Sequence, residues 1–262
     1  MKALFFCGAI LVSLNVFSAS DTLDLKPKPG YGREFQITTQ LLDSYHYRKI
    51  HFNDSMSSVV LDEYIKTLDN NKSYFLLADI KAFDEHRFKM DDYARDEDAL
   101  VAYSIYSVFY TRFQQRMDYV LNHLITSSFD YTVNEFYEPD REKLPWAASE
   151  QELNEIWRKT IKSQALSLRL AGKQDAEINE TLTTRYSRMK KSMDQFNSED
   201  VFSMFMNTVT ETYDPHTNYF SPKTADLFNQ SMSLSLEGIG ARLQTDNDYT
   251  RVVEILPGGP AE

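Results

Sequence analysis

The hydrophobic residues of this chain change their spacing once, near residue 233. From Phe35 to about Met232 they recur every three to four positions, which is typical of amphipathic helices. In 233–244 and again in 250–256 they alternate with polar residues, which is typical of strands. The sequence therefore predicts a mainly α fold: a multi-helix domain over residues 35–232, followed by the beginning of a β domain over residues 233–262.

The longest helical pattern covers residues 99–125 and carries a broad apolar, largely aromatic stripe. Such stripes usually pack in a core. This one comprises Leu100, Tyr103, Tyr106, Phe109, Phe113, Met117, Val120, Leu121 and Leu124. A capping box, Ser149–Glu152, predicts a second long helix that contains Trp157. We expect Phe109 and Trp157 to lie in the core.

Shorter helical patterns complete the predicted domain. One begins at Phe35, with its apolar side formed by Ile37, Leu41, Leu42 and Tyr45. Another is predicted to be capped by Asp54, with Met56, Val59, Val60 and Tyr64 on one face. Two more cover residues 175–193 and 198–212, and Asp214-Pro215 ends the last of them.

The first nineteen residues have the pattern of a secretory signal peptide. A basic start at Lys2 precedes a short apolar run over residues 3–12 and the small residues Ser18-Ala19-Ser20. We expect export with cleavage near Ala19 and no integral membrane segment afterwards, because the apolar run is too short for an anchor. A buried N-terminal helix is the alternative. Residues 20–34 read as an extended leader.

Composition excludes several kinds of site. The net charge of −11 argues against nucleic acid or an anionic membrane surface as partner. Cys7, the only cysteine, would leave with the signal peptide, so no disulfide and no thiolate chemistry are expected. The histidines are scattered at positions 46, 51, 86, 123 and 216, so we predict no metal site and no cofactor.

A glycine turn between two strand patterns is the candidate binding element. Gly238-Ile239-Gly240 opens the backbone where the chain turns, and backbone amides in such turns can hold an anion. Strand, turn and strand together resemble the carboxylate-binding loop of a PDZ domain. The resemblance implies a role for the amides of Ile239, Gly240 and Ala241 in holding a terminal carboxylate.

The same turn supplies candidates for a side-chain pocket. Leu236, Ile239 and Leu243 would take the apolar tail of the bound peptide. We further expect that a bulky residue in place of Gly240 weakens carboxylate binding and leaves stability nearly unchanged. The alternative is that Gly238 and Gly240 only permit a tight turn.

Two flanking motifs extend the resemblance. Tyr213-Asp-Pro-His-Thr-Asn-Tyr-Phe-Ser-Pro222 precedes the turn, and Tyr249-Thr-Arg-Val-Val-Glu-Ile-Leu-Pro-Gly-Gly-Pro-Ala261 follows it. Together they look like the N-terminal half of a tail-specific (carboxy-terminal processing) protease of the Gram-negative periplasm. Such proteases place a helical domain before a PDZ domain and a Ser-Lys catalytic core. The catalytic residues are expected beyond Glu262, and none is assigned here.

The resemblance implies a function for the parent protein. A serine-type endopeptidase would bind the C-terminal tails of periplasmic or envelope proteins and degrade or trim them, in some cases with a helical-repeat lipoprotein adaptor. The expected location is the periplasm, either free or peripheral to the inner membrane, with the helical domain docking substrate or adaptor. In residues 214–222 we expect Asp214 to accept a hydrogen bond in a turn, and Tyr219 and Phe220 to pack inward. The alternative is a non-enzymatic periplasmic chaperone or adaptor that binds peptides.

Overall fold

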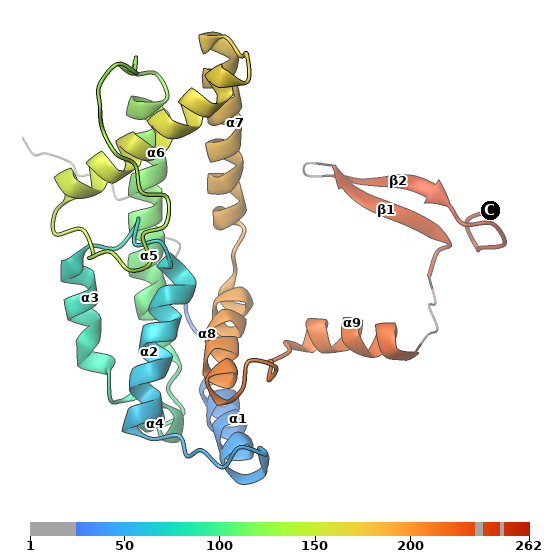
Figure 1. Cartoon of the computed structure of the whole chain (residues 1–262). Helices are drawn as coiled ribbons and strands as arrows, with labels where there is room; N and C mark the ends of the chain where they lie inside the picture. The colour runs from blue at the N-terminus through green and yellow to red at the C-terminus, as the bar shows by residue number, and fades with distance from the viewer. Residues whose placement is uncertain (1–24, 234–237, 247–248) are drawn as a thin grey trace, which may run out of the picture. The chain divides into compact units, whose positions relative to one another are not determined.

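A computed structural model describes residues 25–233, 238–246 and 249–262. The predicted signal peptide therefore lies outside the described residues. The chain divides into two compact units, one ending at His216 and the other running from Thr217 to Glu262 (Figure 1). Helices dominate the first unit, whereas the second has one helix and a hairpin, which confirms the predicted fold class.

The first unit consists of helices joined mostly by short connections. Its α-helices are α1 (Tyr31–Tyr45), α2 (Asp54–Asp69), α3 (Leu77–Phe83), α4 (Met90–Arg95), α5 (Leu100–Tyr119), α6 (Glu150–Leu170), α7 (Asp175–Asp194) and α8 (Ser198–Tyr213). A 3-10 turn, η1 (Asp84–His86), follows α3, and a π-helical turn, η2 (Val120–Leu124), continues α5.

Helix α5 lies in the middle of this unit and contacts α2, α7 and α8 (Figure 1). Helix α2 packs on α8 and α4, and α6 packs on α7. The α5 stripe explains this central position, since all its predicted members from Tyr103 to Met117 are buried. Leu100 is half exposed, because it begins the helix at the edge of the bundle, and Leu121 of η2 is only partly buried.

Aromatic side chains fill two parts of the core. Phe35, Tyr64 and Phe205 join α1, α2 and α8, with ring centroids 5.2 and 5.3 Å apart. The second cluster is centred on Tyr74, whose ring lies 5.5 Å from Phe109 and 5.6 Å from Trp157. The expected burial of Phe109 and Trp157 is confirmed.

The sequence prediction of the α1 face is wrong in detail. Helix α1 begins at Tyr31, and its buried residues are Phe35 and Thr39 rather than the predicted apolar set. Ile37, Leu41 and Tyr45 are exposed. Thr39 can be buried because its hydroxyl donates to the Phe35 and Gln36 carbonyl oxygens.

A long segment without regular helix crosses from η2 to α6, and we call residues 125–148 the strap. It is anchored at several points. The Lys72 ammonium donates to the Leu144 carbonyl oxygen at 2.7 Å, the Leu77 amide donates to the Ala147 carbonyl oxygen at 2.8 Å, and Lys66 pairs with Glu142 at 2.8 Å. These anchors lie on α2, α3 and the α2–α3 connection, so tertiary contacts hold the strap in place.

The second unit contains α9 (Pro222–Ser233), β1 (Ala241–Asp246) and β2 (Tyr249–Ile255). The two strands pair antiparallel, and the register shifts by one residue between Arg242 and Leu243. Helical structure thus reaches Ser233, close to the position where the hydrophobic spacing changes. The division by contacts falls earlier, after His216, so that α9 belongs with the hairpin.

Candidate peptide-binding turn and the exit of the helical unit

Gly240 adopts a conformation that favours glycine. Its φ is +75°, in the left-handed region where a side chain is strained. A Cβ atom placed there would lie 2.8 Å from the Gly259 Cα and 2.9 Å from the Pro260 ring. A side chain at Gly240 would therefore disturb the fold, and the expectation that a bulky residue leaves stability nearly unchanged is wrong.

The turn is closed on one side by the segment after β2. The Leu256 amide donates to the Gly240 carbonyl oxygen at 2.7 Å, and the Gly259 amide donates to the Leu256 carbonyl oxygen at 3.0 Å. Within the described part of the chain, the amides of Ile239 and Gly240 donate to no acceptor. Two adjacent amides at the start of a strand are thus left for an outside acceptor.

Among the described residues, the outer edge of β1 is unpaired. β1 pairs with β2 only, so among the described residues its other edge carries free backbone groups, to which an extended chain can add as a strand. Arg242 lies opposite Glu254 and forms an ion pair with it at 3.1 Å, whereas Ala241 lies opposite Ile255.

One face of the hairpin is apolar. Ala241 and Leu243 share one face of β1. Because of the register shift, their partners are Ile255 and Val252, which are three residues apart in β2. Leu243 is 49% exposed and Ile239 is 58% exposed. Residues 238–241 are consecutive, and Ala241 and Leu243 lie on the same face of β1. Leu236 lies outside the described residues.

The first residues of the Tyr213–Pro222 motif end α8 and contact both the last turn of α1 and the connection between α1 and α2. The Arg48 guanidinium donates to the Tyr213 carbonyl oxygen at 2.5 Å, and so caps the negative end of α8. The Tyr213 hydroxyl donates to Asp43 at 2.7 Å, and the Tyr47 hydroxyl donates to Asp214. Sequence reasoning missed this contribution of Tyr47 and Arg48, since contacts so far apart in the chain leave no local pattern.

Asp214 has the predicted turn role. Its carboxylate accepts the His216 amide at 2.8 Å, which confirms the expected side-chain acceptor. The Tyr47 hydroxyl, together with the His216 amide, lowers the pKa of Asp214 to about 2. The expected packing of the aromatic pair is only half right: Tyr219 is half-buried, whereas Phe220 is 41% exposed with its ring 5.3 Å from that of Phe228 in α9.

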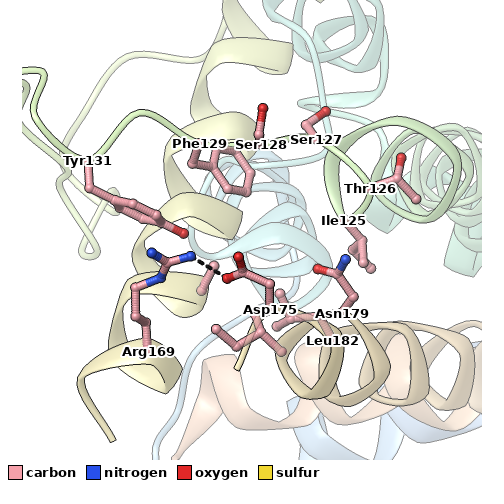
Figure 2. Close-up of a pocket in the computed structure, with 12 residues that line it drawn as sticks. Ile125, Thr126, Ser127, Ser128, Phe129, Tyr131, Arg169, Asp175, Asn179 and Leu182 are labelled. Carbon is pink, nitrogen blue, oxygen red and sulfur yellow. Dashed lines mark hydrogen bonds and ion pairs between the residues drawn. The ribbon is translucent and has the colours of Figure 1, made fainter. Parts of the chain in front are cut away.

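A cavity of about 200 Å³ lies between the start of the strap, the end of α6 and the start of α7 (Figure 2). Its apolar wall includes Ile125 and Leu182, and its rim carries hydroxyls of the Thr126–Ser128 run. Arg169 pairs with Asp175 there, and its guanidinium lies 4.9 Å from the Tyr131 ring centroid. No histidine or cysteine lines this cavity, and its charged pair, Arg169 and Asp175, is mutually satisfied.

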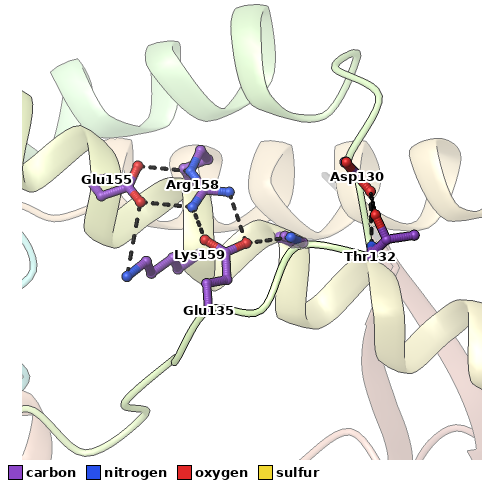
Figure 3. A network of polar contacts seen from close by, with 7 residues as sticks. Asp130, Thr132, Glu135, Glu155, Arg158 and Lys159 are labelled. Atoms are coloured by element: carbon purple, nitrogen blue, oxygen red, sulfur yellow. Dashed lines mark hydrogen bonds and ion pairs between the residues drawn. The ribbon is translucent and has the colours of Figure 1, made fainter.

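Glu135 holds the middle of the strap against α6. Its carboxylate accepts hydrogen bonds from Arg158 and from Lys162, and Arg158 also contacts Glu155 at 2.7 Å (Figure 3). These two cations, Arg158 first, lower the pKa of Glu135 to about 2. No helical or strand pattern in residues 129–145 indicated this contact; the length and aromatic content of that stretch were the available signal.

Within residues 25–233, 238–246 and 249–262, no cluster of three or more potential metal ligands occurs. No helix among these residues combines the length and apolarity that a bilayer crossing requires.

Comparison with known families defines the class of the helical unit. A family model described as the tail specific protease N-terminal domain matches residues 37–223, which includes α2 to α8 and the Tyr213–Pro222 motif. This chain therefore belongs to the tail-specific protease family, as the sequence resemblance predicted.

A named relative supports the same assignment. The tail-specific protease of Haemophilus influenzae is 36% identical to this chain over 248 residues, which cover 91% of this chain and 35% of the relative. The chain thus spans about a third of the length of this relative.

Proposed function

We propose that the full-length protein is a periplasmic serine-type endopeptidase that binds the C-terminal tail of its substrates at the Gly238–Ala241 turn. The proposal rests first on family membership. The structural observation that most supports it is the Gly240 turn. There the amides of Ile239 and Gly240 have no acceptor among the described residues, and the unpaired edge of β1 begins directly after them. Converging amides hold a carboxylate without a charged side chain, and strand addition fixes the direction of the peptide.

In this proposal the apolar face of the hairpin selects the tail. Leu243 and Ile239 are exposed beside the turn and would contact the last side chains of the bound peptide. The serine and lysine of the catalytic core would be supplied by sequence after Glu262. The helical unit would dock substrate polypeptide or a helical-repeat lipoprotein adaptor, and the signal-like residues 1–19 would direct the protein to the periplasm.

The direct test compares peptides rather than protein variants. Full-length protein should bind an apolar-tailed peptide with a free C-terminal carboxylate about tenfold more tightly than its amide, because a charge-assisted hydrogen bond contributes about 1.5–3 kcal/mol. Fluorescence anisotropy measures both. Leu243→Ser should weaken binding of both peptides, whereas Leu227→Ser, at another exposed leucine, on α9, should change neither. Equal affinity for acid and amide would reject this assignment of the turn.

Cleavage decides between the proposal and its alternative. Turnover of an apolar-tailed substrate protein by the full-length protein, followed by mass spectrometry of the products, is expected. Tail binding without turnover would instead favour a non-enzymatic peptide-binding chaperone or adaptor.

A further inference from the structure

The surface between the strap and α6 contains two adjoining hollows. The larger, of about 440 Å³, is bordered by Phe136, Arg141 and Ile156; the smaller, of about 170 Å³, is bordered by Val133 and Leu166. Tyr137 and Lys159 line both hollows. We call the two together the α6 groove.

The apolar side chains of this groove are exposed although their backbone is held. Phe136 is 88% exposed, Val133 53% and Tyr137 37%. Glu135, next to Phe136, is fastened to Arg158 and Lys162, as Figure 3 shows for Arg158, and the Arg141 amide donates to Asn71 at 2.7 Å. An aromatic residue presented on a fixed segment loses little entropy on binding, which is a property of interface anchors.

The charged side chains of the groove differ in whether they have a partner within the protein. Each lining carboxylate has a partner within the strap or α6: Glu135 and Glu155 pair with basic side chains, Glu152 accepts the Ala148 amide at 2.8 Å, and Glu138 accepts the Asp140 amide at 3.3 Å.

Arg141 differs from these groups. Its Nε is buried and has no hydrogen-bond partner, and its guanidinium donates to no described residue. That buried nitrogen is out of reach, whereas the two terminal guanidinium nitrogens are accessible and have no acceptor among the described residues, so an occupant of the groove that brings an acceptor gains affinity. The matching group is a carboxylate, which guanidinium binds through charge-assisted hydrogen bonds.

We propose that the α6 groove binds an extended segment of substrate polypeptide in which an apolar side chain packs against Phe136 and Tyr137 and an acidic side chain pairs with Arg141. That the polypeptide is a substrate rests on the proposed function. This site lies within the helical unit and requires no free C-terminus, so it binds a part of the substrate other than the tail.

The test uses a matched pair of peptides and the full-length protein. Both are fluorescein-labelled and C-terminally amidated; one contains Phe-Leu-Glu and the other Phe-Leu-Gln at the same place. Fluorescence anisotropy should show about tenfold tighter binding of the glutamate peptide, the factor that corresponds to one charge-assisted hydrogen bond. Mass spectrometry confirms that the peptides stay intact during the measurement.

Variants then locate the effect. Arg141→Gln should abolish the difference between the two peptides, whereas Arg188→Gln, which alters an exposed arginine of α7, should preserve it. Phe136→Ser should weaken both peptides equally, and Phe88→Ser, at another exposed phenylalanine, should weaken neither. Helical circular dichroism establishes that each variant is folded.

Three results would overturn the proposal. The first is equal binding of both peptides by the unaltered protein, a comparison that depends on no variant. The second is a glutamate preference that persists in Arg141→Gln. The third is a change of oligomeric state in Phe136→Ser, which would assign the groove to a second copy of the chain. Because the probes are amidated, loss of the free-carboxylate preference at the Gly240 turn would leave these results unchanged and would count only against the proposed function.

Discussion

Asn53, and not its neighbour Asp54, caps the N-terminus of α2. It precedes α2 with extended backbone, and its side-chain oxygen accepts the amides of Ser55 and Met56 at 3.0 and 3.2 Å. Asp54, the residue that the sequence predicted as the cap, is already the first helical residue. Both are good cap types, so side-chain chemistry does not separate them; only the residue outside the helix can direct its oxygen at the free amides.

Substitutions at Asn53 and Asp54 test which of the two residues caps α2. Asn53→Ala should lower the free energy of unfolding by about 1 kcal/mol, because two amides lose their acceptor. Asp54→Ala should lower it by no more than about 0.5 kcal/mol, since only its favourable interaction with the helix dipole is lost. Urea unfolding followed by helical circular dichroism measures both. Equal losses, or the larger loss at Asp54, would contradict the assignment of the cap.

At the scale of elements, the strap depends on tertiary contacts rather than on secondary structure of its own. Its centre is held by Glu135, whose carboxylate is 20% exposed and lies between Arg158 and Lys162. These cations hold the folded-state pKa of Glu135 at about 2, against an ordinary value of 4.5. A depressed carboxylate pKa stabilises the folded state above pH 4.5, and this contribution is lost as the pH falls toward 2.

The strap should therefore open in acid before the helices do. Hydrogen-exchange protection of residues 131–148 should fall between pH 4.5 and 2, the window set by the two pKa values of Glu135. Glu135→Gln should show weaker protection of the strap already at neutral pH and a flatter profile across this window. The amides of α5 serve as the internal reference. The same acid dependence in the Gln variant would show that another group holds the strap.

At the scale of the whole molecule, the two units differ in how completely they bury their apolar residues. The helical unit has a continuous core, with Phe35, Tyr64 and Phe205 all fully buried. In the second unit, Leu243, Val252 and Ile255 of the hairpin remain about half exposed. Two-stranded hairpins are marginally stable unless further strands or a helix cover one face.

Hydrogen exchange should separate the units. In a polypeptide of these 262 residues, amides of β1 and β2 should show little protection, while those of α5 and α8 should be strongly protected. In the full-length protein, the hairpin amides should become protected, because additional strands would cover the apolar face and the β1 edge. Strong protection of the hairpin in the shorter chain would show that it is stable without further sequence.

Hydrophobic spacing, cap residues and helix-ending prolines determined much of this protein by themselves. They specify the helical class, the helices α5 to α8, the burial of Phe109 and Trp157 and the change to strands near residue 233, because each depends on neighbours within a few turns of chain. The tertiary structure decided which face of α1 is buried, which of two residues caps α2, how Tyr47 and Arg48 fasten the end of α8, and how Glu135 holds the strap. Those contacts join residues far apart in sequence, and their energies depend on distances that no local pattern encodes. The Gly240 turn is determined by both the sequence and the tertiary structure. Its glycines are visible in the sequence, but the close approach of Gly259 appears only once the strands have paired.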